Sequence, residues 1–195
     1  VVTGGIGYIG TELCKIYSGI SWNNEILVID NRFLSERVNQ LRNWGIDFIH
    51  GDILDKDLVN KHCKDADIVH HLAGITDVPR VKSESSNEKD MKIKLVGEKG
   101  TQNILEAISD KCKIIFPSTH VVYEGINEVR NNILEEEDTK PILSYASSKA
   151  INEHQLKNSG KKYIILRLGS VYGYSNDNAR IDIMPNLFSK IASQD

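Results

Sequence analysis

Two side chains in the last third of the chain have the types and spacing needed for acid–base chemistry. Tyr145 and Lys149 lie four residues apart, so on a helix both project from one face. A free phenol, with a pKa of about 10, is a poor base at neutral pH, but nearby positive charge favours the phenolate. Tyr145 could then remove a proton from a sugar or alcohol hydroxyl that Thr119 holds. A pair with this spacing also arises by chance, with an exposed stacking role as the alternative.

A glycine loop at the start of the chain fits a dinucleotide. Gly4, Gly7 and Gly10 come between a short β-branched segment and an amphipathic one. In a strand–loop–helix unit the first glycine permits a tight turn, the second lets the backbone approach a pyrophosphate, and the third allows close helix packing. The start of the helix favours the anionic phosphates. Glycines can also serve plain turns, but the flanking segments favour the dinucleotide site.

An acidic residue closes the next apolar run. Asp30 lies 20 residues after Gly10, where its carboxylate can accept hydrogen bonds from adenosine ribose hydroxyls. The same charge would repel a 2′-phosphate, so the sequence predicts NAD rather than NADP as the cofactor. Arg32 could weaken that preference, and a solvated surface arginine is the alternative interpretation.

The composition excludes several classes of protein. Of 195 residues, 40% are hydrophobic, which is enough for one domain with a core. The net charge is −3 and no basic stripe indicates nucleic-acid binding. No apolar run is long enough to span a membrane. Cys14, Cys63 and Cys112 have no metal-binding spacing and suggest no disulfide framework, so we expect no metal site and a cytoplasmic location.

Apolar β-branched runs alternate with amphipathic segments along the chain. The strands are predicted at 1–3, 25–30, 46–50, 67–72, 113–118 and 162–168, and the helices at 8–18, 35–44, 55–63, 88–109, 145–159 and 184–193. This alternation predicts an α/β fold with a doubly wound parallel sheet in the order 3-2-1-4-5-6. Since the first strand is short and the last helix has no cap, we expect a fragment with residues missing at both ends.

Seven short segments of the chain form a set of motifs. They read TGGIGYIG at 3–10, GDI at 51–53, HLAG at 71–74, GTQNILEA at 100–107, STHVVY at 118–123, YASSK at 145–149 and LRLGSVYG at 166–173. Together they resemble extended short-chain dehydrogenases/reductases of the NAD-dependent epimerase/dehydratase family, which act on nucleotide sugars. The resemblance covers essentially the whole chain.

The resemblance implies roles for individual residues. The catalytic group is implied to be Thr119, Tyr145 and Lys149. Contacts to NAD are implied for Gly4, Gly7, Tyr8, Ile9, Asp30, Asn31, Asp52, Ile53, Leu72, Ala73, Gly74, Tyr145 and Lys149. Contacts to the nucleotide-sugar substrate are expected from Thr119, His120, Ser170 and Arg180. For His120, a hydrogen-bonded histidine at a strand end is the alternative, and for Arg167 a structural ion pair is favoured over phosphate binding.

Some positions depart from the family pattern. Ser170 replaces an asparagine, Gly97 stands where asparagine is frequent, and Glu124 follows Tyr123 where glycine is frequent. Val121 stands where sugar-nucleotide 4,6-dehydratases carry an acidic residue, and valine cannot take a proton. The sequence therefore favours an isomerase similar to UDP-glucose/UDP-galactose 4-epimerases, acting through a transient 4-keto sugar. A dehydratase, reductase or decarboxylase of the same family, or a non-catalytic NAD-binding module, is the alternative.

The resemblance also implies the organisation of the protein. Residues 1–173 would form an NAD-binding Rossmann domain, and 174–195 would begin a smaller substrate-binding lobe that is largely absent from this chain. The family implies a homodimer, for which the segments 88–109 and 145–159 are candidate interface helices.

Overall fold

The computed structural model describes residues 1–20, 24–76, 86–175 and 183–194. Six strands form one sheet, and every pairing in it is parallel. In chain order they are β1 (Val2–Thr3), β2 (Leu27–Asp30), β3 (Asp47–His50), β4 (Ile68–His71), β5 (Lys113–Thr119) and β6 (Lys162–Leu168). The spatial order β3-β2-β1-β4-β5-β6 confirms the predicted topology.

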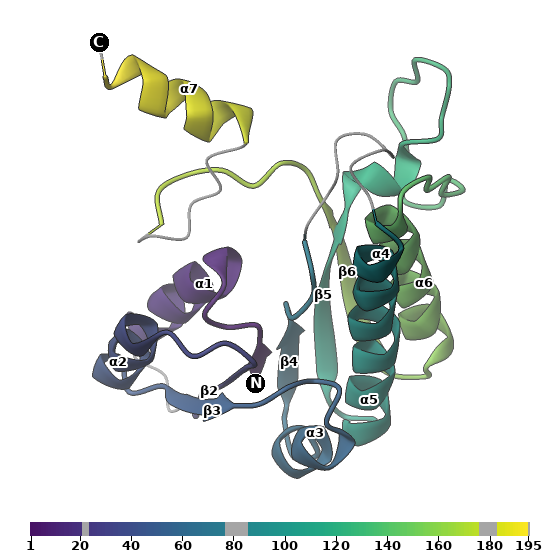
Figure 1. The fold of residues 1–195 in the computed structure, drawn as a ribbon. Coiled ribbons are helices and arrows are strands. Elements are labelled where there is room, and N and C mark those ends of the chain that lie inside the picture. The colour runs from purple at the N-terminus through teal and green to yellow at the C-terminus, as the bar shows by residue number, and fades with distance from the viewer. Residues whose placement is uncertain (21–23, 77–85, 176–182, 195) are drawn as a thin grey trace.

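Helices cover both faces of the sheet (Figure 1). The first face carries α1 (Tyr8–Ser18) and α2 (Ser35–Asn43). The opposite face carries α3 (Lys56–Cys63), α4 (Asn87–Lys94), α5 (Gly100–Ala107) and α6 (Ser144–Asn158). A further helix, α7 (Met184–Ala192), follows near the end of the chain and has no buried residue. The doubly wound α/β fold is therefore the one that the alternation of segments predicted.

The sheet separates two apolar clusters, one under each helical layer. Beneath α1 and α2 the buried residues are Val2, Ile6, Cys14, Val28, Leu41 and Ile46. Beneath the other layer the larger cluster includes Ile29, Val59, Val69, Ile104, Ile114, Phe116 and Leu156. Burial on both faces explains why the central strands read as continuous apolar runs rather than alternating ones. All three cysteines are free and buried.

One predicted helix is divided in the structure. The segment predicted as continuous over 88–109 consists of α4, a π-helical turn at Leu95–Lys99 and α5, which ends at Ala107. The wide turn lies close to α6, because a Cβ atom added to Gly97 would come 2.3 Å from Ser148 Oγ. Asn152 Nδ2 also donates a hydrogen bond to the Gly97 carbonyl at 3.1 Å. Gly97, a departure from the family pattern, is thus explained by helix packing.

The remaining differences concern the ends of elements. Most strands and helices end within two residues of their predicted limits, as frayed termini allow. Within the described ranges, the helices are too short or too polar to cross a bilayer. Nor does any cluster of three or more histidine, cysteine or acidic side chains in those ranges have the arrangement of a metal site.

Candidate active site

A cleft of about 1040 Å³ opens where the strands of the sheet end. Its lining includes the glycine loop, the ends of β2, β4 and β5, and the start of α6. Every predicted site residue within the described ranges contributes to it: Gly4, Gly7, Tyr8, Ile9, Asp30, Asn31, Asp52, Ile53, Leu72, Ala73, Gly74, Thr119, His120, Tyr145, Lys149 and Ser170. Arg180 lies outside the described residues. Segments that are distant in the sequence therefore meet in one cavity, as expected at the carboxyl edge of a parallel sheet.

The glycine loop has no room for side chains. Gly4 has a φ of +70°, and a Cβ atom there would lie 2.7 Å from the backbone nitrogen of Ala73. At Gly10 a Cβ atom would lie 2.6 Å from the Cα atom of Gly5. Helix α1 begins after Gly7 without a capping side chain. The bare backbone and the positive end of the helix fit a pyrophosphate, so the loop is compatible with NAD.

Asp30 lies at the base of the cleft with its side chain only 4% exposed. Its carboxylate accepts hydrogen bonds from the backbone amides of Ile6 at 3.3 Å and Arg32 at 3.0 Å. The Arg32 side chain is half exposed, and its Nε atom lies 3.4 Å from Asp30 Oδ1. Arg32 is therefore a surface residue that also contacts the carboxylate. Asp30 is the last residue of β2, the position from which a carboxylate can accept hydrogen bonds from the ribose hydroxyls of a dinucleotide.

A buried hydrogen-bonded chain fixes the loop that follows β4. His71 Nδ1 lies 2.9 Å from Thr3 Oγ1, and His71 Nε2 lies 3.0 Å from Thr101 Oγ1. Thr3 Oγ1 in turn accepts from the amide of Ala73 at 3.3 Å. Burial lowers the pKa of His71 to about 3, so the ring is neutral at physiological pH. His70, its neighbour on β4, contacts the hydroxyl of Tyr17 on the opposite face.

The GDI segment is held by α5 and by the residue after β2. Asn103 Nδ2 donates to the carbonyls of Ile53 and Leu54, at 2.9 and 3.1 Å. Asp52 accepts from Asn31 Nδ2 at 3.0 Å and from the amide of Leu54 at 2.9 Å. These bonds fix the backbone of Asp52 and Ile53, for which the resemblance implies contacts to NAD.

Lys149 reaches from α6 under the end of β5. Its Nζ atom donates to the Pro117 carbonyl at 2.7 Å, and it lies 4.3 Å from the centre of the Phe116 ring and 5.9 Å from that of Tyr145. Burial lowers the pKa of Lys149 to about 8, an effect that the Glu153 carboxylate opposes. At neutral pH the ammonium therefore still favours the Tyr145 phenolate. Thr119, the last residue of β5, also lines the cleft and is 7% exposed.

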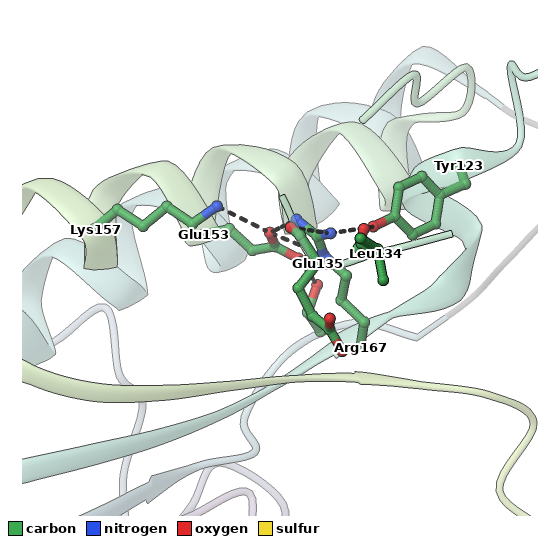
Figure 2. Close-up of polar contacts among 7 residues, drawn as sticks. Tyr123, Leu134, Glu135, Glu153, Lys157 and Arg167 are labelled. Carbon is green, nitrogen blue, oxygen red and sulfur yellow. Dashed lines mark hydrogen bonds and ion pairs between the residues drawn. The ribbon is translucent and has the colours of Figure 1, made fainter. Parts of the chain in front are cut away.

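A second polar network centres on Glu153 and Arg167 (Figure 2). Glu153, one helical turn after Lys149, accepts from Ser118 Oγ at 2.5 Å and from Arg167 Nη2 at 2.6 Å. Arg167 also donates to the Tyr123 hydroxyl and to the carbonyl of Glu135. Arg167 is therefore in a structural ion pair, the alternative that the sequence favoured over phosphate binding.

Some residues that line the cleft, or that contact the residues lining it, were not predicted from the sequence. Glu153 is one of them, although its four-residue spacing from Lys149 is a signal that could have found it. Cleft-lining residues on and after α4 form another group: Lys89, Lys92, Ile93, Leu95 and Val96. They lie on α4 or in the π-helical turn that follows it, a turn for which the sequence gives no local signal.

The lowered pKa of Lys149 predicts a pH dependence of stability. Between about pH 8 and the ordinary lysine value of 10.5, the unfolded chain holds this proton and the folded chain has lost it. Stability rises with pH wherever the unfolded state binds more protons. From pH 7 to 9.5, the free energy of unfolding of the wild type should therefore rise by about 2 kcal/mol relative to a Lys149→Met variant. Urea unfolding of both proteins across this range measures the difference, and parallel pH profiles would contradict the prediction.

The fold and the cleft define a class of protein: a Rossmann-type dinucleotide-binding domain with the Tyr–Lys pair of short-chain dehydrogenases/reductases. The chain matches the model of the NAD dependent epimerase/dehydratase family over residues 1–195, and it belongs to that family. The family's cofactor is NAD, which confirms the prediction from the glycine loop and Asp30.

Curated relatives and solved structures agree with this assignment. The chain is 29% identical to a dTDP-D-glucose 4,6-dehydratase of Dictyostelium discoideum, over 89% of the chain and 44% of the relative. It is 28% identical to a UDP-glucose 4-epimerase of Mycoplasma genitalium, over 99% of the chain and 60% of the relative. The structure of UDP-glucuronic acid 4-epimerase from Bacillus cereus with UDP-glucuronic acid and NAD has a TM-score of 0.76 at 27% identity, over 98% of this chain and 62% of that one. The chain thus spans less than two thirds of each.

Proposed function

We propose that the protein is an NAD-dependent nucleotide-sugar 4-epimerase, similar to UDP-glucose/UDP-galactose 4-epimerases, that acts through a transient 4-keto sugar. One observation carries the proposal: a single cleft collects the glycine loop and Asp30 together with Thr119, Tyr145 and Lys149. A non-catalytic NAD-binding module would need the first group but not the second. Relatives that are epimerases support the same conclusion.

The side chains would divide the work as follows. The partly buried Lys149 ammonium favours the phenolate form of Tyr145, which accepts the proton of the sugar 4-hydroxyl. Thr119 holds that hydroxyl in place. NAD held by the glycine loop and Asp30 would supply reversible hydride transfer at the sugar carbon. His120 and Ser170 line the cleft beside Thr119 and are proposed to contact the substrate.

Val121 is the observation that favours an epimerase over a dehydratase. Its side chain lines the cleft two residues after Thr119 and carries no proton to exchange. Elimination of water needs an acid and a base at the sugar, whereas epimerisation needs only reversible oxidation at one carbon. The dehydratase from Dictyostelium shows that the family includes both reactions, so the residue types around Thr119 carry this distinction.

The organisation of the whole protein belongs to the proposal. We assign residues 1–173 to the NAD-binding domain and 174–195 to the start of the substrate-binding region. A homodimer formed through the outer faces of α4, α5 and α6 is supported by exposed apolar residues there, among them Met91 on α4 at 64% and Ile151 on α6 at 41%. The three free cysteines are consistent with a cytoplasmic location.

The decisive experiment uses the full-length protein, because this chain spans only part of its relatives. The protein is incubated with UDP-galactose, UDP-glucose and their N-acetyl forms, and inversion at C4 is followed by NMR. Inversion supports the proposal. Bound NAD without inversion of any substrate would refute the 4-epimerase assignment and favour the reductase, decarboxylase or non-catalytic alternative.

Removing the Asp30 carboxylate should change the choice of cofactor. In an Asp30→Ser variant the ribose hydroxyls lose an ionised acceptor, a loss of roughly 1.5–3 kcal/mol, so NAD should bind about 10- to 100-fold more weakly. NADP should gain relative to NAD, because the repulsion of its 2′-phosphate is relieved. Calorimetric titration with both cofactors measures the ratio, and the exposed Asp65→Ser variant is the control. An unchanged ratio would contradict this role for Asp30.

A further inference from the structure

Glu124 stands where the family pattern favours glycine, and its side chain contacts the start of α6. Glu124 Oε1 accepts hydrogen bonds from the backbone amides of Ile142 and Leu143, at 2.6 and 2.5 Å. Leu143 is the N-cap residue of α6, which begins at Ser144, and the Leu143 side chain itself makes no capping hydrogen bond. Glu124 therefore supplies, from an earlier part of the sequence, an acceptor that the helix entry lacks locally.

A single tight turn joins Glu124 to Thr119. Thr119 Oγ1 accepts from the amide of Val121 at 3.3 Å, and this bond caps the 3₁₀ turn His120–Tyr123. The amide of Glu124 then donates to the carbonyl of Val121 at 3.1 Å. The Glu124 carboxylate thus forms a short bridge between the turn that carries Thr119 and the helix entry that carries Tyr145, two residues after Leu143.

The loop between the 3₁₀ turn and α6 is closed by backbone hydrogen bonds that do not involve the Glu124 side chain. The amide of Lys140 donates to the carbonyl of Val122, and the amide of Gly125 donates to the carbonyl of Lys140, both at 2.8 Å. A Cβ atom on Gly125 would lie 2.4 Å from the Lys140 oxygen, so this approach requires glycine. The need for glycine is met at position 125, which leaves position 124 available for a side chain.

Other contacts anchor the rest of the loop and of α6. The Tyr123 hydroxyl donates to the Leu134 carbonyl at 3.1 Å, and Arg167 donates to the Glu135 carbonyl at 3.0 Å (Figure 2). Further along α6, Lys149 is bonded to Pro117 and Glu153 to Ser118. Loss of the Glu124 carboxylate would therefore loosen the first turn of α6, where Tyr145 lies, and leave the later turns in place.

We propose that Glu124 is a positioning residue that sets the Tyr145 phenol relative to the Thr119 hydroxyl by fixing the entry of α6. This inference rests on the proposed function, in which both groups act on one substrate hydroxyl. The carboxylate is well suited to the task, because bonds from amides to an ionised acceptor are strong and a negative charge is favourable at the start of a helix.

The test compares Glu124→Ala and Glu124→Gln in the full-length protein. The alanine variant loses the acceptor, and its kcat should fall about 10- to 100-fold, the effect of a small misplacement in an active site. Its KM and its affinity for NAD should stay within a few-fold of the wild type. The glutamine variant keeps an oxygen acceptor and should recover most of the lost kcat. The control is Glu128→Ala, which removes a carboxylate of the same loop whose side chain is 78% exposed.

A second measurement does not depend on turnover. Hydrogen exchange at the amides of Ile142 and Leu143 should be faster in the alanine variant than in the wild type, with the glutamine variant between them. Unchanged exchange would overturn the proposal whatever the activity, and so would a wild-type kcat in the alanine variant or a loss that glutamine does not recover. If the wild type turns over no nucleotide sugar, the proposed function fails, and the exchange rates alone decide whether Glu124 fixes α6.

Discussion

Replacement of Tyr145 by phenylalanine is expected to lower kcat by about 10³-fold, within the range of roughly 10²–10⁴ that a positioned general base contributes. The variant keeps the aromatic ring and loses only the hydroxyl that would take the substrate proton. NAD affinity should change little, because the glycine loop, Asp30 and the GDI segment are untouched. The loss should therefore appear in kcat rather than in cofactor binding.

The measurement pairs steady-state kinetics with fluorescence titration of NAD. Tyr163→Phe is the matched control: it makes the same change on β6, where the side chain is 41% exposed and does not line the cleft. It should keep wild-type kcat. A Tyr145→Phe variant with wild-type turnover would show that another group takes the proton.

Removal of one partner of the buried ion pair should have the largest effect on stability. Glu153 and Arg167 have side chains that are 3% and 12% exposed, with 2.6 Å between Oε2 and Nη2. An Arg167→Met variant leaves the Glu153 carboxylate buried, with a hydrogen bond from Ser118 and a more distant ion pair with Lys157 (Figure 2). Because an uncompensated buried charge is costly, the free energy of unfolding should fall by about 3 kcal/mol.

Urea unfolding measures this loss of stability, and two further variants serve as comparisons. Arg130→Met breaks the pair with Glu137, in which both side chains are more than a third exposed, and should change stability little. The double change Arg167→Met with Glu153→Met removes both charges and should recover part of the lost stability. If Arg167→Met and Arg130→Met lowered the free energy of unfolding equally, leaving the Glu153 carboxylate without Arg167 would carry no large desolvation cost.

Much of the cleft could be predicted because its residues lie at fixed places relative to local patterns. Gly4, Asp30 and Thr119 each stand directly at or after the end of a strand, and parallel strands bring their carboxyl ends to one edge. Tyr145 and Lys149 share a helix face because of their spacing alone. The alternation of strands and helices was equally readable, since both periodicities are local.

The residues that escaped prediction depend on contacts between distant segments. The sequence predicted an ion pair for Arg167 but not its partner, because Glu153 on α6 meets Arg167 on β6 only in the folded chain. Glu124 looked like a simple departure from the family pattern, and its partners are backbone amides, which leave no trace in the sequence. The glycine at position 97 has the same origin, because Ser148 leaves no room there for a side chain.

The π-helical turn at Leu95–Lys99 changes what a deletion would do to the helices on either side of it. A turn closed by i→i+5 hydrogen bonds takes up one residue more than an α-helical turn, whereas each residue of a regular α-helix adds a rotation of about 100°. Deleting one residue within the π-helical turn would therefore restore an α-helical turn and keep α4 and α5 in nearly the same orientation, with Ile93, which is 4% exposed, still in the core. The same deletion within α5 would turn the residues on either side of it by about 100° relative to each other, so a one-residue deletion should be tolerated better in the π-helical turn than in α5.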